Sequence, residues 1–429
     1  MSPLTKPPTP SPFRVLHHRN YRLLWTGSVA AALGGSVGGL IVNWIVFAAT
    51  HNPLAITALG IASFLPTLIF GVYAGALVDR WDRRRLIVGC NAGRAICYGV
   101  LAISVLLLGV DLAVVLACVF AVAALATLSR PASNALLPRI LSPSDMTDGN
   151  GLLQAGSTAA GFLGSPLGGV LLVALAVLGG TLVGAAVGLG VNAATETLAG
   201  VLIALMFLQS KTEKTKPSEK PSLTHEVREG MRFLRTQEAL LTITLLAMVA
   251  NFFGSMVNAY IVVYVVERLH LGSTAFGLLL AAATAGFGVG ALLPGRLRAD
   301  RAPGVWAGAS WGASGLPIIG LALTTWLPGA VGFMFAWSTL VAVGGTAWLS
   351  AAQRTVPDEF MGRYFALDEA GSYAMIPAGQ IVGGLAILAV GVSESFLIAG
   401  IGGAASASAM LLSPAVRAWA RAPSKGGST

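Results

Sequence analysis

The chain has 429 residues, of which 55% are hydrophobic and 10% are charged, with a net charge of +9 and a mean hydropathy of +0.76. Soluble globular proteins carry about 25% charged residues, so this composition excludes a protein that covers its surface with polar groups in water. Repeated apolar runs of about 18 residues or more indicate helices that cross a membrane, whereas a membrane β-barrel would show alternating segments of about ten residues. The predicted fold class is an all-α membrane protein.

Twelve apolar stretches, bounded by charged residues, proline or glycine clusters, predict twelve membrane-spanning helices. They lie at 22–49, 54–78, 86–109, 112–129, 152–176, 181–208, 239–265, 273–295, 303–325, 329–350, 365–391 and 394–413. The junction between the fifth and the sixth is the least distinct, because residues 176–192 are rich in glycine.

The distribution of lysine and arginine predicts the orientation, because these residues are retained on the cytoplasmic side of short loops. With twelve helices and a cytoplasmic N-terminus, 25 of the 27 lysines and arginines fall on that side. Arg268 alone lies outside and Arg94 alone lies within a span. We therefore expect a multi-pass protein of the plasma (inner) membrane with both termini in the cytoplasm. Topology and anionic lipids account for the positive charge, so no nucleic-acid partner is expected.

A charged segment that contains proline divides the chain. It includes SKTEKTKPSEKPS, which cannot bury a core and predicts a cytoplasmic linker. Apolar residues at helical spacing predict a short amphipathic helix at 223–234. The expected domains are an N-terminal tail at 1–21, a six-helix bundle at 22–208, the linker at 209–238, a second six-helix bundle at 239–413 and a C-terminal tail at 414–429.

An internal repeat supports two halves. A Gly-Ser pair followed twelve residues later by a Gly-Gly pair occurs in the fifth and in the eleventh predicted helix, 215 residues apart. The pairs begin at Gly156 and Gly168, and again at Gly371 and Gly383. Parallel six-helix repeats are typical of transporters whose two bundles rock around a site near the middle of the membrane.

The loop after the second predicted helix reads GALVDRWDRRR from Gly75 to Arg85. It resembles the G-x-x-x-D-R-x-G-R-R loop between helices two and three of the major facilitator superfamily, with Asp82 where glycine is usual. The resemblance covers nearly the whole chain and is closest to the drug, macrolide and siderophore exporter branch that includes the enterobactin exporters. It is carried by FRVLHHRNYRLLWTG at 13–27, SFLPTLIFGVYAGALVDRWDRRRL at 63–86, SRPASNALLPRIL at 129–141, HEVREGMRFLR at 225–235 and VPDEFMGR at 356–363. It implies the major facilitator fold and a secondary transporter.

The same loop predicts a gate. Asp79 ends the second helix, where a carboxylate can face the positive N-terminus of another helix. The resemblance implies that this is the eleventh helix, which starts near Arg363. The loop arginines can pair with Asp79, Asp82 or lipid phosphates and hold the cytoplasmic side shut. The predicted gating residues are Gly75, Asp79, Arg80, Arg83, Arg84 and Arg363.

Ionisable side chains inside a span cost roughly 2.5–3.5 kcal/mol on the insertion scale, so each is a candidate functional group. Glu196 lies in mid-helix with Asn192 one turn earlier, so both can face one aqueous cavity, and a carboxylate buried between helices is the alternative. For Arg94 the alternative is a structural pair, and for Asp368 and Glu369 it is solvation or a place in the gate. The candidates for proton or substrate coupling are Glu196, Arg94, Asp368 and Glu369.

The resemblance implies proton-coupled antiport, yet two features of related exporters are missing. Leu33-Gly34 is followed by Gly35 instead of an acid, and Arg130 at the cytoplasmic end is the only arginine of the fourth helix. The sequence GFLGSPLGG at 161–169 resembles the antiporter motif G-P-x-x-G-G with altered spacing. Export is the expected direction. Import of a nutrient or siderophore and lipid flipping are the alternatives.

Aromatic and asparagine side chains in the spans predict a cavity for a hydrophobic or amphipathic small molecule. The candidates are Trp44, Phe64, Phe252, Phe253, Tyr260, Trp337, Trp348, Tyr373 and Met375, with Asn43, Asn251 and Asn258 as polar anchors. We expect fewer than half of them to line it. The predicted substrate-binding residues are Asn43, Trp44, Asn192, Asn251, Tyr260 and Tyr373.

The remaining motifs exclude other classes of protein. The sequence has no GxxxxGK[ST] loop, so we expect an ion gradient, with protons as the coupling ion, to drive transport instead of ATP. The five histidines lie in tails and loops, so neither an enzyme nor a metal site is predicted, and no cofactor is expected. The cluster GFGVG at 286–290 lies in a span and predicts close helix packing or a flexible hinge. The expected partners are a small-molecule substrate, protons and membrane lipids, and the expected state is a monomer.

Overall fold

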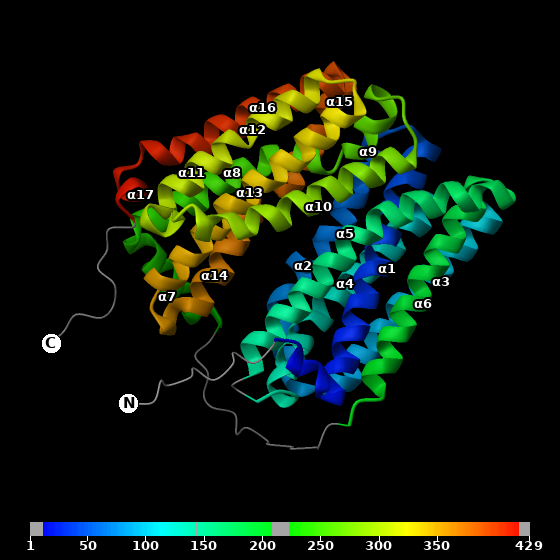
Figure 1. Ribbon diagram of the computed structural model, residues 1–429, viewed down its shortest axis with the longest axis horizontal. Coiled ribbons are helices and arrows are strands. Elements are labelled where there is room, and N and C mark those ends of the chain that lie inside the picture. The colour runs from blue at the N-terminus through cyan, green and yellow to red at the C-terminus, as the bar shows by residue number, and fades with distance from the viewer. Residues whose placement is uncertain (1–11, 143–144, 208–222, 420–429) are drawn as a thin grey trace, which may run out of the picture. The chain divides into compact units, whose positions relative to one another are not determined.

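A computed structural model of the protein describes residues 12–142, 145–207 and 223–419. Within this part of the chain the elements are helices and no strand occurs, as predicted for an all-α membrane protein (Figure 1). The helices are α1 (Arg19–Thr50), α2 (Pro53–Arg80), α3 (Arg83–Leu108), α4 (Leu112–Leu136), α5 (Met146–Gly179), α6 (Thr181–Ala204), α7 (Leu223–Thr236), α8 (Glu238–Asn258), α9 (Ile261–Val263), α10 (Ser273–Arg296), α11 (Pro303–Ala313), α12 (Gly315–Leu323), α13 (Leu327–Thr355), α14 (Asp358–Tyr373), α15 (Ile376–Val390), α16 (Val392–Ser408) and α17 (Pro414–Ala418).

Eleven helical stretches of the described chain are long and apolar enough to cross a membrane. The ninth span expected from the sequence, at 303–325, is present as two shorter helices, α11 and α12. They meet at Ser314, which keeps helical dihedral angles (φ −64°, ψ −18°), so the helical path continues through the junction. Eleven long stretches and this pair are consistent with the twelve predicted spans.

The outer face of α3 shows why these helices need lipid around them. Ile96, Val100, Ile103 and Leu107 follow one another at the spacing of a single helix face, and each is at least 48% exposed. A helix on the surface of a soluble protein carries polar residues at such positions. An apolar face of this kind is stable in contact with lipid tails, so the chain is a multi-pass membrane protein.

The helices fall into two compact units. One consists of residues 1–45 and 62–212, and the other of residues 46–61 and 213–429. The end of α1 and the start of α2 therefore belong to the second unit, where the Thr57 hydroxyl lies 2.6 Å from that of Tyr260. The domain boundaries predicted from the linker, 22–208 and 239–413, stay a prediction.

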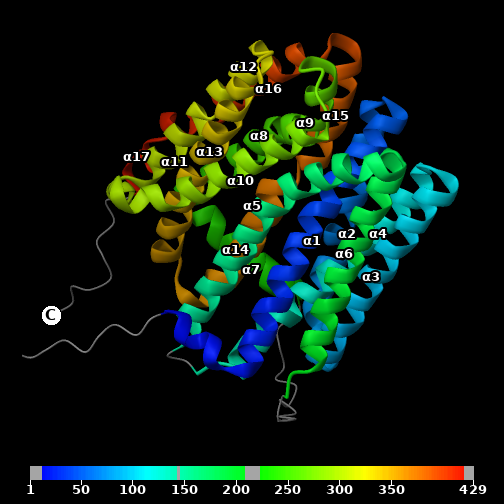
Figure 2. The same ribbon diagram turned by 45° about the vertical axis from the view of Figure 1, so that its right-hand side comes forward.

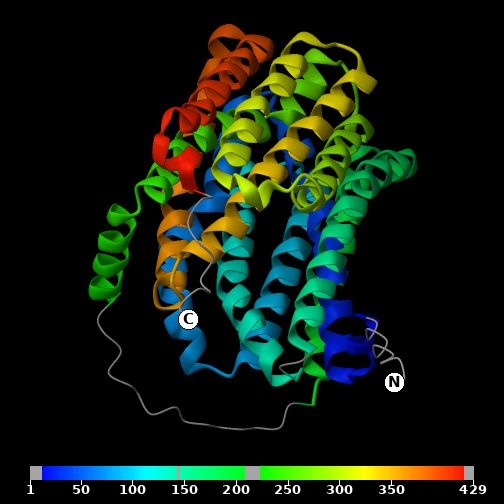
Figure 3. The same cartoon turned by 60° about the vertical axis from the view of Figure 1, so that its left-hand side comes forward.

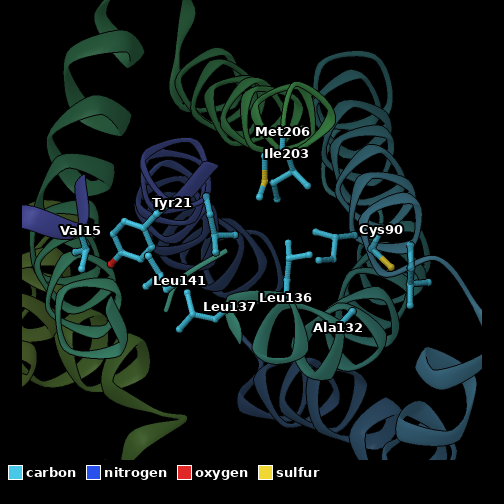
Figure 4. Close-up of a cluster of buried hydrophobic side chains, with 12 residues drawn as sticks. Val15, Tyr21, Cys90, Ala132, Leu136, Leu137, Leu141, Ile203 and Met206 are labelled. Carbon is cyan, nitrogen blue, oxygen red and sulfur yellow. The ribbon is translucent and has the colours of Figure 1, made fainter. Parts of the chain in front are cut away.

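A cluster of buried apolar side chains joins α1, α3, α4 and α6 in the first unit (Figure 4). Its members are Val15, Tyr21, Leu24, Leu86, Ile87, Cys90, Ala132, Leu136, Leu137, Leu141, Ile203 and Met206. Tyr21 is fully buried, and its hydroxyl donates a hydrogen bond of 2.7 Å to the Gly149 carbonyl at the start of α5. Lipid already solvates apolar groups, so close packing and hydrogen bonds stabilise such a cluster more than the hydrophobic effect does.

In the first unit, α5 packs on α1 through glycines. A Cβ atom added to Gly164 would lie 2.7 Å from the Leu33 carbonyl oxygen, and one added to Gly168 would lie 3.2 Å from the backbone of Val37. A side chain at Gly164 would not fit, and one at Gly168 would push the two backbones apart by a few tenths of an ångström, so glycine permits their close approach.

In the second unit, α15 packs on α8 in the corresponding way. A Cβ atom on Gly379 would overlap the Phe252 carbonyl, and one on Gly383 would lie 3.0 Å from the Cα atom of Met256. Gly168 and Gly383 are the residues that the repeated sequence pattern aligns, so that pattern marks the same helix contact in both units.

Each unit also contains a helix junction formed by a single glycine. Gly180 joins α5 to α6 at φ +87°, and Gly391 joins α15 to α16 at φ +90°. Both amides donate to the carbonyl four residues earlier, at 2.7 Å from Ala176 and 2.9 Å from Ile387. Only glycine adopts these φ values without strain. The glycine-rich junction between the fifth and sixth predicted helices is thus one sharp turn.

The α10 helix lies along α13 in the second unit, as Figures 1 and 2 show. Gly286 and Gly290 face this neighbour, and a Cβ atom on either would overlap a backbone carbonyl of α13, that of Phe335 or of Thr339. The cluster GFGVG therefore serves close helix packing, as predicted.

The amphipathic helix predicted at 223–234 is confirmed as α7, which lies beside α14 in the second unit (Figure 3). The rings of Phe233 and Phe360 stack there with their centres 4.7 Å apart and their planes 4° from parallel. Leu234 belongs to the buried cluster that holds α7 against α8, α13 and α14.

Asp145 ties the segment before α1 to the start of α5. Its carboxylate lies 2.7 Å from Arg14 and 3.5 Å from His18, and it accepts a hydrogen bond of 2.9 Å from Ser142. The hydrogen bonds from Arg14 and then Ser142 lower the pKa of the Asp145 carboxyl. The ionised carboxylate therefore stabilises this contact.

Asp145→Asn is expected to lower the melting temperature of the purified protein near neutral pH and to have no effect in strong acid. The pKa of Asp145 is lower in the folded protein than its unfolded value of about 3.9. Its stabilisation is therefore complete above that value and is lost as the pH falls through the folded-state pKa. The difference between wild type and variant should be constant above about pH 5 and shrink below about pH 4. A difference that persists in strong acid contradicts the ion pair, and Asp148→Asn in the first turn of α5 is the control.

Candidate functional site

A cavity of about 900 Å³ lies within the second unit, among α8 and α10–α16. Small-molecule sites in proteins have volumes of roughly 300–1,000 Å³ and mostly apolar walls. Large aromatic side chains supply much of this lining, namely Phe287, Trp311, Trp337, Trp348, Phe365 and Tyr373. The cavity can therefore surround the apolar body of a small molecule.

Two helices contribute to the lining with one face each. On α13, Trp337, Val341 and Gly345 follow at intervals of four residues, so the side chains on this face become smaller along the helix. On α8, Asn251, Ser255 and Asn258 form a polar stripe at the same helical spacing. Asn251 donates a hydrogen bond of 2.9 Å to the Ser372 carbonyl, which fixes its side chain against α14.

Asp368 and Glu369 on α14 are the charged residues of the cavity lining. Asp368 is 6% exposed, and its Oδ1 atom accepts a hydrogen bond from the Thr244 hydroxyl and another, at 3.5 Å, from Ser372. Glu369 is exposed. Sequence reasoning left a solvated or gating place open for both. In the structure both line the cavity, and the exposure of Glu369 agrees with a solvated position.

The first unit contains a second polar cluster, between α3 and α6. Arg94 and Glu196 form an ion pair of 3.0 Å, and Arg94 also donates a hydrogen bond of 2.5 Å to Asn91. Glu196 is 3% exposed and Asn192 is fully buried, so in this structure neither faces an open cavity as the sequence suggested. A Cβ atom on Gly38 of α1 would overlap the Asn192 amide, so this glycine makes room for it.

The structure separates the predicted substrate-binding residues. Asn251 and Tyr373 line the cavity, together with Trp337, Trp348 and Asn258 from the wider set of candidates. Tyr260 does not line it: its ring is fully buried, and its hydroxyl bonds to Thr57 and to the Gln380 carbonyl.

Asn43, Trp44 and Asn192 belong to the first unit and are not among the residues that line this cavity. Asn43 is partly buried and donates to the Gly39 carbonyl of its own helix at 2.9 Å. Trp44 is also partly buried. Sequence reasoning missed Trp311 and Gln380, which do line the cavity. The sequence feature that could have indicated Trp311 as a lining residue is its position in a glycine- and serine-rich part of a span, GASWGASG.

Part of the predicted gate lies in the described structure. The side chains of Gly75, Asp79, Arg80 and Arg363 lie outside the described residues. Arg83 is partly buried, and Arg84 donates a hydrogen bond to the Ala204 carbonyl at the end of α6. The pairing predicted between these arginines and Asp79 stays a prediction.

Asp82, where related loops carry glycine, begins α3. Its backbone is extended (φ −65°, ψ 115°), and its side chain accepts a hydrogen bond of 2.8 Å from the Arg85 amide. A carboxylate that caps a helix N-terminus stabilises it. The substitution is thus accounted for by local helix capping.

The family model of the Major Facilitator Superfamily matches residues 24–376. The chain is 22% identical to macrolide efflux protein A of Streptococcus pyogenes, over 89% of this chain and 94% of that protein. It is 24% identical to the MFS-type transporter YfiS of Bacillus subtilis, over 84% of each chain.

Solved structures share the fold. The nucleoside transporter NupG has a TM-score of 0.70 and 11% identity, over 92% of this chain and 98% of that one. A D-xylose-proton symporter has a TM-score of 0.67 and 13% identity, over 93% of this chain and 97% of that one. Helical architecture, the loop at Gly75–Arg85 and the family model agree: the chain belongs to the Major Facilitator Superfamily, whose members transport small molecules across membranes.

Proposed function

We propose that the protein exports hydrophobic or amphipathic small molecules by alternating access, driven by a proton gradient. The observation that carries this proposal is the cavity of about 900 Å³ with its aromatic walls and its polar stripe on α8, which suits a hydrophobic or amphipathic substrate. The relatives named for macrolide efflux support export and this class of substrate.

Glu196 is the proposed proton site. Protonation of Glu196 would remove the charge that balances Arg94, so the gain or loss of a proton would alter the contact between α3 and α6. A conformational change requires such a difference in interaction between two states. The site thus links a proton to the arrangement of helices in the first unit without the acid that related exporters carry in their first helix.

We propose that Asp79 and the arginines of the loop between α2 and α3 form the cytoplasmic gate together with Arg363, which lies near the start of the eleventh predicted span. We propose that the protein lies in the plasma membrane with both termini in the cytoplasm. The support is that lysine and arginine are concentrated in the tails and loops on one predicted side of the membrane. The functional unit is proposed to be a monomer.

The test is transport by the purified protein in proteoliposomes, with cationic dyes, macrolides and siderophores, and with or without an imposed pH gradient. We expect substrate to move in the export direction when the gradient is applied. Glu196→Gln should abolish the response to the gradient, and Glu394→Gln, an exposed carboxylate on α16, should leave it unchanged. Movement in the import direction, or export that ignores both the gradient and Glu196→Gln, contradicts the proposal.

A further inference from the structure

The cavity of the second unit carries unbalanced negative charge. Asp368 and Glu369 are its charged residues, and no salt bridge joins either to a cation within the described part of the chain. The hydroxyls of Thr244 and Ser372 bond the same oxygen of Asp368, Oδ1, and they are neutral. A buried carboxylate without positive charge nearby is costly. A cationic ligand would remove this cost.

A third group of the lining points to the same kind of ligand. The Oε1 atom of Gln380, on α15, is buried and has no hydrogen-bond partner in the described structure. A buried acceptor without a donor costs about 1–3 kcal/mol. The Asp368 carboxylate and this amide oxygen are both acceptors, so a ligand with N–H or O–H donors complements them.

The aromatic walls add a further preference. Trp311, Trp337 and Trp348 come from two helices and line one cavity with the two carboxylates. Trp348 meets Phe365 edge to face, with ring centres 5.9 Å apart, and Phe365 precedes Asp368 by three residues on α14. Aromatic ring faces attract organic cations, and tryptophan does so most strongly.

We propose that this cavity selects organic cations, with the positive nitrogen at Asp368 and Glu369 and the apolar body against the tryptophans. The inference rests on the proposed transport function and narrows its substrate class. Neutral molecules of the same shape lose the charge interaction. Anions, including carboxylate siderophores, are rejected because the lining repels their charge.

The test uses three dyes with one xanthene body and different charge: rhodamine 6G, a cation; rhodamine B, a zwitterion; and fluorescein, an anion. Binding to the full-length protein in nanodiscs is measured at neutral pH by fluorescence anisotropy. Rhodamine 6G should bind at least about tenfold more tightly than fluorescein, the change that one charge contact of about 1.4 kcal/mol produces.

The variants assign that preference to the two carboxylates. Glu369→Gln should weaken the binding of rhodamine 6G by about tenfold, and Asp368→Asn with Glu369→Gln should weaken it further. Glu394→Gln should change nothing. Since Glu369 is exposed, its variant folds even where Asp368→Asn does not.

Three results would overturn the inference. The three dyes bind equally, rhodamine 6G does not bind, or Glu369→Gln binds rhodamine 6G as tightly as wild type does. The binding assay does not require transport. The charge selectivity of the cavity and the proposed transport function can therefore be contradicted independently. Cation-selective binding without transport contradicts only the proposed function, whereas transport of neutral and anionic compounds as fast as cations contradicts only the charge selectivity.

Discussion

Glu196→Gln is expected to destabilise the protein by about 3–5 kcal/mol, because it leaves the charge of Arg94 between α3 and α6 without its partner. The ion pair of 3.0 Å joins two helices whose contact is extensive, and Glu196 is 3% exposed. The Arg94 side chain is only 17% exposed, so water solvates the remaining guanidinium poorly. The measurement is the melting temperature of the purified variant in detergent.

A double variant separates structure from coupling. Arg94→Met with Glu196→Leu removes both charges, so most of the lost stability should return, since apolar residues of similar volume often replace a buried ion pair without loss. If Glu196 carries the proton, the double variant is stable and its transport no longer responds to a pH gradient. Recovery of gradient-driven transport in the double variant contradicts the coupling role and leaves the pair a structural one. Equal melting temperatures of the single variant and wild type contradict the ion pair itself.

The helices could be predicted from the sequence because their length is set by the membrane. A run of apolar residues that spans hydrocarbon must form helix, since every backbone polar group needs an internal partner. The first predicted span at 22–49 is therefore close to α1, Arg19–Thr50. The interruption at Ser314 was not predictable, because α11 and α12 are both apolar and contain glycine, and no charged residue lies between them.

The partners of the charged side chains could not be predicted in the same way. Glu196 and Asn192 share a helix face, and that much follows from their spacing. Whether that face meets water or another helix depends on how α6 packs, and hydropathy carries no information about it. Gly38 of α1 packs against the Asn192 side chain, and Arg94 of α3 forms an ion pair with Glu196. Both contacts join helices far apart in the sequence.

The same limit applies to the cavity. Asp368 and Glu369 stand near the start of the eleventh predicted span, where sequence position alone suggests contact with the aqueous surface. The structure places them in a cavity wall because α14 packs against α8, where Thr244 meets Asp368. The polar stripe of Asn251, Ser255 and Asn258 on α8 was the stronger signal, since its helical spacing marks one face.

Gly286→Leu is expected to prevent α10 from packing on α13. Even a Cβ atom at this position would overlap the Phe335 carbonyl, and a backbone carbonyl cannot turn away as a flexible side chain can. The two helices would have to separate along their contact, at a cost of about 1–3 kcal/mol or more from overpacking alone. The expected result is a large fall in melting temperature and in the yield of monodisperse protein.

Gly288→Leu in the same helix is the matched control. A Cβ atom at Gly288 meets no atom within 4 Å, so the larger side chain has open space. Leucine also favours helix over glycine by about 0.8–1 kcal/mol, so this variant should be as stable as wild type or more so. Equal loss in both variants would mean that α10 tolerates no large residue anywhere, and no loss in Gly286→Leu would mean that the close contact with α13 is absent. Loss confined to Gly286→Leu assigns the GFGVG cluster to the helix interface that borders the cavity.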